Sequence, residues 1–352
     1  MRLFSTEQVS KYHPDKLADQ ISDLILTEVL KQDKLAQCGV ETLIKGSTVV
    51  LGGEITANAK INYKKIVKQF MSNMRQPFSK LINLIGKQSK EINSAVVNTA
   101  NFGAGDQGMM YGYACRETES MLPYGFDLAN KIIKNIESYA DRNEYFKGDA
   151  KCQVTVDLDK RGIDSLHTIL VSVCQKKDCT LDMAMRVVKN ILKELHVPID
   201  KIKLIINPSG DWFVGGARAD CGLTGRKIVC DQYGGYCPVG GGAFSGKNPT
   251  KVDRSAAYMA RYLAKYVLKT VSPKASFCEI QLSYGIGMSE PIGLSVKTDI
   301  KDEGEKLVNI LLRKFNLTPA GIINFFDLYN VNYGIIAQGC HYRDEEFPWE
   351  IY

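Results

Sequence analysis

The sequence predicts an α+β protein of three similar blocks, in which helices cover one face of mixed or antiparallel sheets. The 352 residues exceed what one hydrophobic core usually organises. Segments with apolar residues three or four apart, typical of helices, recur between β-branched segments typical of strands. Glycine-broken strand pairs indicate hairpins, which favours layered sheets over strict βαβ alternation.

The first block is predicted as a helix, a hairpin and a second helix. Apolar residues recur at helical spacing over 17–32. The β-branched stretch 42–61 is interrupted by glycines, which predicts two strands and a turn. Residues 63–76 return to helical spacing.

The later blocks repeat this pattern. The stretch 91–108 is rich in Asn, Ser, Ala and Gly, which predicts a long loop, and we expect 91–102 to close over a site. Beyond it we expect strands over 151–162, 165–177, 201–210 and 276–287, and helices over 181–197 and 256–270.

Composition excludes several classes of protein. A net charge of +6 fits a protein that handles anions, but it is too small for a dedicated nucleic-acid binder. Ten scattered cysteines without a CxxC pair argue against a zinc framework and predict free thiols in a reducing cytosol. No apolar run approaches about 18 residues and the N-terminus lacks an apolar signal region. We therefore expect a cytoplasmic protein with no membrane segment.

A glycine-rich loop crowded with cations carries the strongest functional signal. Gly241, Gly246 and Lys247 match part of a Walker A pattern, but Asn248 stands where Ser or Thr would bind magnesium. A true P-loop is therefore not predicted. Glycines still let backbone N–H groups approach phosphate oxygens, and the lysine adds positive charge. Taken alone, the loop is also compatible with a turn carrying solvated lysines.

Three further segments add to this signal. Residues 220–228 form a second glycine-punctuated loop, 13–20 place a His-Pro-Asp-Lys run before a helix, and 103–114 surround one carboxylate with glycines. Alone, the second and third are also compatible with a helix cap and a tight turn. Together the segments supply cations for a polyphosphate, lone carboxylates suited to Mg²⁺, and further carboxylates suited to an ammonium group. The cations are Lys151, Arg226, Lys227, Lys247 and Lys251, and the carboxylates are Asp15 and Asp253 for the metal and Glu54 and Asp106 for the ammonium group. This inventory predicts ATP with metal ions.

Long motifs across the chain resemble the S-adenosylmethionine synthetases (methionine adenosyltransferases). They include STEQVSKYHPDKLADQISD, GAGDQGMMYGYACRETESMLP, NPSGDWFVGG, GGGAFSGKNPTKVDRSAAYMARYLAK and FPWE, in family order from residue 5 to residue 350. The resemblance implies three similar domains around a pseudo-threefold axis, expected over 1–92, 103–211 and 213–352. It also implies a homodimer at minimum, possibly a homotetramer, with active sites at the subunit interface.

The resemblance implies a reaction between ATP and L-methionine. The methionine sulfur attacks C5′ of ATP, and the displaced triphosphate is hydrolysed to pyrophosphate and phosphate. Two Mg²⁺ ions per site and K⁺ are the implied cofactors. By this resemblance His13 is the hydrogen-bond donor to the leaving oxygen, the triphosphate is bound by Lys151, Arg226, Lys227 and Lys247, and the rest of ATP is bound by Asp149, Trp212, Asp220 and Ala243. Methionine is bound by Glu54, Gln88, Asp106 and Lys251. The implied ligands are Asp15 and Asp253 for Mg²⁺, and Glu41 and Ser245 for K⁺.

The chain departs from the family pattern at three positions. Trp212 stands where an aromatic residue stacks on adenine, and stacking should survive because indole is the larger platform. Asp211 replaces a basic residue, and Arg116 replaces a polar or acidic one. Two alternatives to an active synthetase are another ATP-dependent phosphoryl transferase and a catalytically impaired regulatory relative. Asn248 argues against the former, and the retained histidine, carboxylates and cations argue against the latter.

Overall fold

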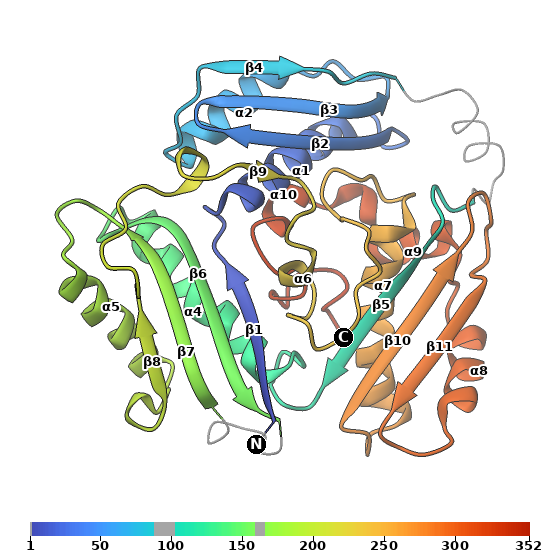
Figure 1. Ribbon diagram of the computed structural model, residues 1–352. Helices are drawn as coiled ribbons and strands as arrows, with labels where there is room; N and C mark the ends of the chain where they lie inside the picture. The colour runs from blue at the N-terminus through green and yellow to red at the C-terminus, as the bar shows by residue number, and fades with distance from the viewer. Residues whose placement is uncertain (1, 88–102, 159–165) are drawn as a thin grey trace.

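Three β-sheets surround the centre of the molecule, each backed by a long helix (Figure 1). The computed structural model describes residues 2–87, 103–158 and 166–352, and every statement below concerns these residues. The sheets have strand orders β4-β3-β2-β9, β1-β6-β7-β8 and β11-β10-β5. The predicted α+β class is confirmed.

Each sheet is built around one repeated unit of a long helix, an antiparallel hairpin and a shorter helix. The first unit is α1 (Pro14–Gln32), β2 (Gln37–Lys45), β3 (Thr48–Thr56) and α2 (Tyr63–Asn73). The second is α4 (Tyr124–Asp141), β6 (Phe146–Asp157), β7 (Leu166–Gln175) and α5 (Leu181–Glu194). The third is α7 (Val252–Tyr266), β10 (Phe277–Tyr284), β11 (Gly293–Thr298) and α8 (Gly304–Lys314). Parallel strands β4 (Lys80–Asn83) and β8 (Lys203–Ile206) extend the first two sheets.

The strand that precedes each long helix pairs with a strand in the sheet of another unit. β1 (Leu3–Val9) precedes α1 but pairs antiparallel with β6 of the second unit. β5 (Gly108–Cys115) precedes α4 but pairs with β10 of the third unit, and β9 (Gly222–Leu223) precedes α7 but pairs with β2 of the first. This cyclic exchange ties the three units together around the pseudo-threefold axis. The domain boundaries expected along the chain stay a prediction, because the sheets cross them.

The inner faces of the units meet in a core that includes the C-terminal segment. α10 (Tyr333–Ile336) packs on α1 and α9 (Pro319–Phe326) packs on α7. Trp349 is fully buried and stacks on Tyr258 of α7. The remaining short helices are α6 (Ile228–Asp231) and 3₁₀ turns at Ile199–Lys201, Gly216–Arg218 and Leu328–Asn330.

Most predicted elements are observed, with boundaries set by local chemistry. The helix expected over 17–32 begins earlier, because His13 is its N-cap and Pro14 suits the first helical position. The helix expected over 256–270 ends at Tyr266 and continues as a π-helical turn, Val267–Val271. The strand expected over 201–210 is limited to β8, since a turn follows at Pro208. All ten cysteines are free thiols, and no helix in the described ranges is long and apolar enough to cross a membrane.

Candidate active site

His13 lies at the N-terminus of α1 with only 4% of its surface exposed. Its Nδ1 accepts a hydrogen bond from the backbone N–H of Asp15 at 3.2 Å. Burial lowers the pKa of His13 to about 3, and the positive charges of Lys227 and Lys151 add to this effect. A neutral imidazole that accepts at Nδ1 carries its proton on Nε2. His13 can therefore donate one hydrogen bond from Nε2 without being charged.

Asp15 connects His13 to the loop that follows β9. Its Oδ2 accepts from Lys227 Nζ at 2.6 Å, and its Oδ1 accepts from the backbone N–H of Leu223 at 3.0 Å. The guanidinium of Arg226 lies 3.9 Å from Oδ1. Burial alone would raise the pKa of Asp15, but the hydrogen bonds from Lys227 and Leu223 outweigh burial and hold that pKa below its usual range. The carboxylate is thus ionised and faces two cations.

Asp149 and Lys151 of β6 complete this first group. Asp149 Oδ2 accepts from the backbone N–H of Gly216 at 2.7 Å, whereas its buried Oδ1 has no hydrogen-bond partner in the described part of the chain. Burial raises the pKa of Asp149 to about 6. Lys151 and Asp220 both act electrostatically on His13 and on Asp149. An unsatisfied buried carboxylate oxygen is costly, which marks Asp149 as a candidate ligand-binding residue.

Trp212 lies at the start of the segment that leads to Gly216. Its indole Nε1 donates to the carbonyl of Val214 at 2.5 Å, and its backbone pairs with Gln175 at the end of β7. Asp211 accepts from the Gln175 side chain at 3.1 Å. The replacement of a basic residue at 211 therefore supports the local fold of this segment. The stacking role of Trp212 stays a prediction.

A second group of predicted residues lines a cavity of about 420 Å³ between the β2–β3 hairpin and the loop before α7. Ser245 is buried and its Oγ has no partner among the described residues. The loop is bound to the hairpin through Val40 N–H, which donates to Gly246 O at 3.1 Å. An orphaned hydroxyl in a cavity that Glu41 also lines fits the chemistry of a K⁺ site. The predicted residues that line this cavity are Glu41, Glu54, Ala243, Ser245, Lys247 and Lys251.

Asp253 and Asp106 lie close to residues that line this cavity. Asp253 is the second residue of α7, is 9% exposed, and accepts from Lys247 Nζ at 2.6 Å. A Cβ added to Gly242 would lie 2.1 Å from Asp253 Oδ1, so the close approach requires glycine. Asp106 follows Gly105, whose backbone N–H donates to Thr250 O at 3.2 Å. The Gly105–Thr250 contact places Asp106 next to the loop that carries Lys251.

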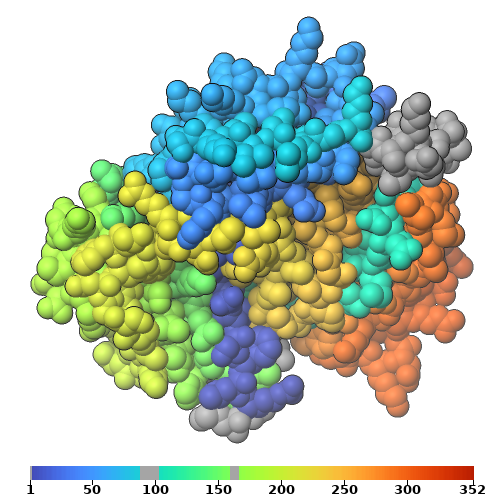
Figure 2. Space-filling model, turned by 45° about the horizontal axis from the view of Figure 1, so that its top comes forward, coloured from blue at the N-terminus to red at the C-terminus, as the bar shows by residue number. Residues whose placement is uncertain are grey.

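The loop that follows β9 contacts both groups. Thr224 of that loop lines the cavity of the second group, and a Cβ on Gly225 would lie 2.6 Å from Ala243 Cβ. In Figure 2 the segment that carries both basic loops, coloured yellow to gold, forms a band beneath the blue first unit. Gln88 and the loop 91–102 lie outside the described residues. The remaining predicted residues thus fall into two adjoining groups.

Asp15 and Asp253 fit the way proteins hold magnesium. Each is the second residue of a long helix, where the helix dipole favours negative charge. Within the described ranges no three His, Cys, Asp or Glu side chains cluster to hold a metal ion. Mg²⁺ commonly takes one or two carboxylates and completes its shell with phosphate oxygens and water. Single carboxylates beside phosphate-binding cations match that chemistry.

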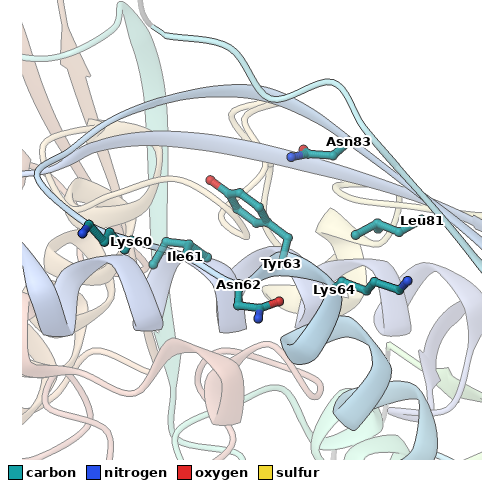
Figure 3. A pocket seen from close by; sticks show the side chains of 7 residues that line it. All are labelled: Lys60, Ile61, Asn62, Tyr63, Lys64, Leu81 and Asn83. Atoms are coloured by element: carbon teal, nitrogen blue, oxygen red, sulfur yellow. The ribbon is translucent and has the colours of Figure 1, made fainter.

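A separate cavity of about 530 Å³ lies at the start of α2 (Figure 3). Figure 3 shows Tyr63 rising from the helix toward the strands. No residue predicted for the site lines it; its residues are Lys60, Ile61, Asn62, Tyr63, Lys64, Leu81 and Asn83.

Sequence reasoning missed three residues that hold the basic loops, namely Asp19, Asp23 and Arg254. Asp19 accepts from Gly225 N–H and Asp23 accepts from Gly246 N–H. The available signal was the spacing of aspartates four residues apart from Asp15 onward, on one face of α1.

The chain matches three domain models of one protein family along its length. These are S-adenosylmethionine synthetase, N-terminal domain, over residues 1–96; central domain, over 101–212; and C-terminal domain, over 214–351. The chain is also similar to a solved structure described as an unusual S-adenosylmethionine synthetase from Campylobacter jejuni. The two are 32% identical with a TM-score of 0.90, over 99% of this chain and 97% of that chain.

Proposed function

Because the chain belongs to the S-adenosylmethionine synthetase family, we propose that it makes S-adenosylmethionine from ATP and L-methionine. A lone pair of the methionine sulfur forms a bond to C5′ of ATP while the C5′–O5′ bond breaks. The triphosphate leaves with the bonding electrons and the sulfur becomes a sulfonium cation. Water then cleaves the bound triphosphate into pyrophosphate and phosphate.

The state of His13 is the single observation that carries this proposal. It is buried and neutral, its Nδ1 accepts from the Asp15 N–H, and its Nε2–H has no acceptor among the residues that the structure describes. Negative charge develops on O5′ as the bond to C5′ breaks, so a donor placed there stabilises the transition state more than the ground state. A neutral donor suits a step in which the leaving triphosphate takes no proton.

The cations of both groups support binding of the polyphosphate. Lys151, Arg226 and Lys227 surround His13 and Asp15, and Lys247 lies at the second group. Magnesium held by Asp15 and Asp253 would add positive charge on the phosphate oxygens. Asp149 offers its unpaired oxygen to the nucleoside part of ATP.

The carboxylates of the second group suit methionine. Glu54 lines the cavity and can bind the ammonium group, and Asp106 favours the positive charge that develops on sulfur. We further propose that the chain forms a homodimer in which residues of both subunits contribute to each site. K⁺ held near Glu41 and Ser245 would order the loop that carries Lys247.

The experiment is to incubate the purified protein with ATP, L-methionine, Mg²⁺ and K⁺ and to identify every product by mass spectrometry and phosphate assays. A synthetase yields the sulfonium together with equimolar pyrophosphate and phosphate. Formation of ADP would instead identify a phosphoryl transferase, and absence of any turnover would identify an impaired relative. Omission of methionine is the control that separates simple ATP hydrolysis from adenosyl transfer.

A further inference from the structure

Helix α1 carries three buried aspartates in one row. Asp15, Asp19 and Asp23 are four residues apart, so they share one face of the helix. Their exposed fractions are 2%, 0% and 0%. Like charges at this spacing destabilise a helix, and buried carboxylates are costly unless they are paired. The row therefore requires specific partners.

Each aspartate accepts a hydrogen bond from the backbone of a basic loop. Asp15 accepts from Leu223 N–H at 3.0 Å and Asp19 accepts from Gly225 N–H at 2.8 Å. Asp23 accepts from Gly246 N–H at 2.7 Å. Two separate loops are thus bound to successive turns of one rigid helix.

The two loops have the same local structure. One has the sequence Thr224-Gly225-Arg226 and the other Ser245-Gly246-Lys247. The glycines have φ of +80° and +81°, a left-handed conformation that side chains disfavour. A Cβ on Gly246 would also lie 1.9 Å from the carbonyl oxygen of Val40. In each loop the N–H held by α1 belongs to the residue immediately before a cation.

The second oxygen of each inner aspartate is bound as well. Asp19 Oδ2 accepts from Lys16 Nζ at 3.0 Å. Arg254 donates to both oxygens of Asp23, at 2.9 and 2.5 Å, and also to the carbonyl of Lys247 at 3.1 Å. Both carboxylates are therefore fixed in orientation, and Arg254 holds the second loop from its other side.

We propose that Asp19 and Asp23 are positioning residues that set the spacing between the Arg226 loop and the Lys247 loop. Four residues of helix correspond to about 6 Å along the axis, so α1 holds the two loop backbones one turn apart. This spacing fixes the distance between the two cations that we propose bind polyphosphate. The inference rests on the proposed function, since it names how that site is held in shape.

The test measures binding of inorganic tripolyphosphate with Mg²⁺ by isothermal titration calorimetry, which does not depend on turnover. Asp19→Ala removes the acceptor for Gly225 N–H and should weaken affinity about tenfold. Asp19→Asn keeps an oxygen acceptor of the same shape and should restore part of the loss. Glu28→Gln is the matched control, because Glu28 is an exposed carboxylate of the same helix paired with Lys31. It should bind as the wild type does.

A double-mutant cycle separates positioning from general destabilisation. If Asp19 acts through the first loop, Asp19→Ala should cost little in an Arg226→Ala background and its full amount in a Lys247→Ala background. Equal losses in both backgrounds, or wild-type affinity in Asp19→Ala, would overturn the proposal. If Asp19→Ala does not fold, the same cycle is run with Asp19→Asn. If the wild type forms the sulfonium but the cycle shows no coupling between Asp19 and Arg226, the positioning role alone is refuted. If the coupling is present but no sulfonium forms, the proposed reaction alone is refuted. A wild type that does not bind tripolyphosphate refutes both.

Discussion

The ammonium of Lys247 lies 2.6 Å from the carboxylate of Asp253, six residues further along the chain. Lys227 and Asp15 form the same pairing at the same distance, 2.6 Å, in the other group. Each carboxylate that we propose binds magnesium is thus paired with a lysine that we propose binds phosphate. Polyphosphate and Mg²⁺ can replace this pairing, since the lysine then binds phosphate and the carboxylate binds the metal. The ion pairs orient both carboxylates before ATP arrives.

Asp253→Asn should therefore raise the Mg²⁺ concentration needed for half-maximal turnover by about tenfold, because a neutral amide is a weaker ligand for a hard cation. The measurement is a Mg²⁺ titration of the initial rate at saturating ATP and L-methionine. Asp302→Asn removes an exposed carboxylate that lies 4.0 Å from the ammonium of Lys301, and it should leave the titration unchanged. A variant at 253 with the wild-type Mg²⁺ dependence would remove this residue from the metal site.

His13→Ala should lower turnover far more than it lowers ATP affinity. Loss of one donor to developing negative charge typically costs on the order of 100-fold in rate. ATP affinity should change little, since the cations around His13 remain. Single-turnover rates and equilibrium ATP binding measure the two quantities separately. A near-normal single-turnover rate would show that His13 does not act on the leaving group.

Periodicity predicted the helices and hairpins because these depend on residues near each other in sequence. It did not predict the exchange of strands. Leu3 pairs with Asp157, and nothing in the local alternation of β1 specifies a partner so distant. For the same reason, the three repeated units were expected to be contiguous segments of the chain.

The residue types of the site were predictable from glycine, cation and carboxylate clusters, but their supporting contacts were not. Asp19 and Asp23 have the polar character of a solvated helix face, yet both are fully buried. Arg116 had no evident partner in the sequence. It donates to the carbonyls of Ala275 and Leu268, at 2.9 and 2.5 Å, and so satisfies backbone groups at the π-helical turn. Residue patterns do not show which backbone donors and acceptors of distant segments a side chain will bind.

Asp149→Asn should stabilise the protein at neutral pH. Burial raises the pKa of Asp149 to about 6 from an ordinary 3.8, so the native state binds more protons than the unfolded state between these values. The contribution of Asp149 to the free energy of unfolding of the wild type therefore falls as pH rises through that window. The variant lacks this loss, and its advantage should be near zero below about pH 4 and on the order of 2 kcal/mol above about pH 7.

Urea unfolding of both proteins across this pH range measures the difference. The same variant should bind ATP more weakly if the unpaired oxygen of Asp149 contacts the nucleoside. A stability difference independent of pH would mean that Asp149 does not titrate in this window.

Two inactive variants should complement each other if each site draws on both subunits. His13 belongs to the first group and Lys247 to the second, so in a dimer the two residues can belong to different sites. Co-expression of differently tagged His13→Ala and Lys247→Ala chains, followed by tandem purification, yields the mixed dimer. One of its two sites would then be intact and the other doubly substituted, so its turnover should reach about half that of the wild type. If each site instead took both residues from one chain, both sites of the mixed dimer would be damaged and its turnover would stay at the level of the parent variants.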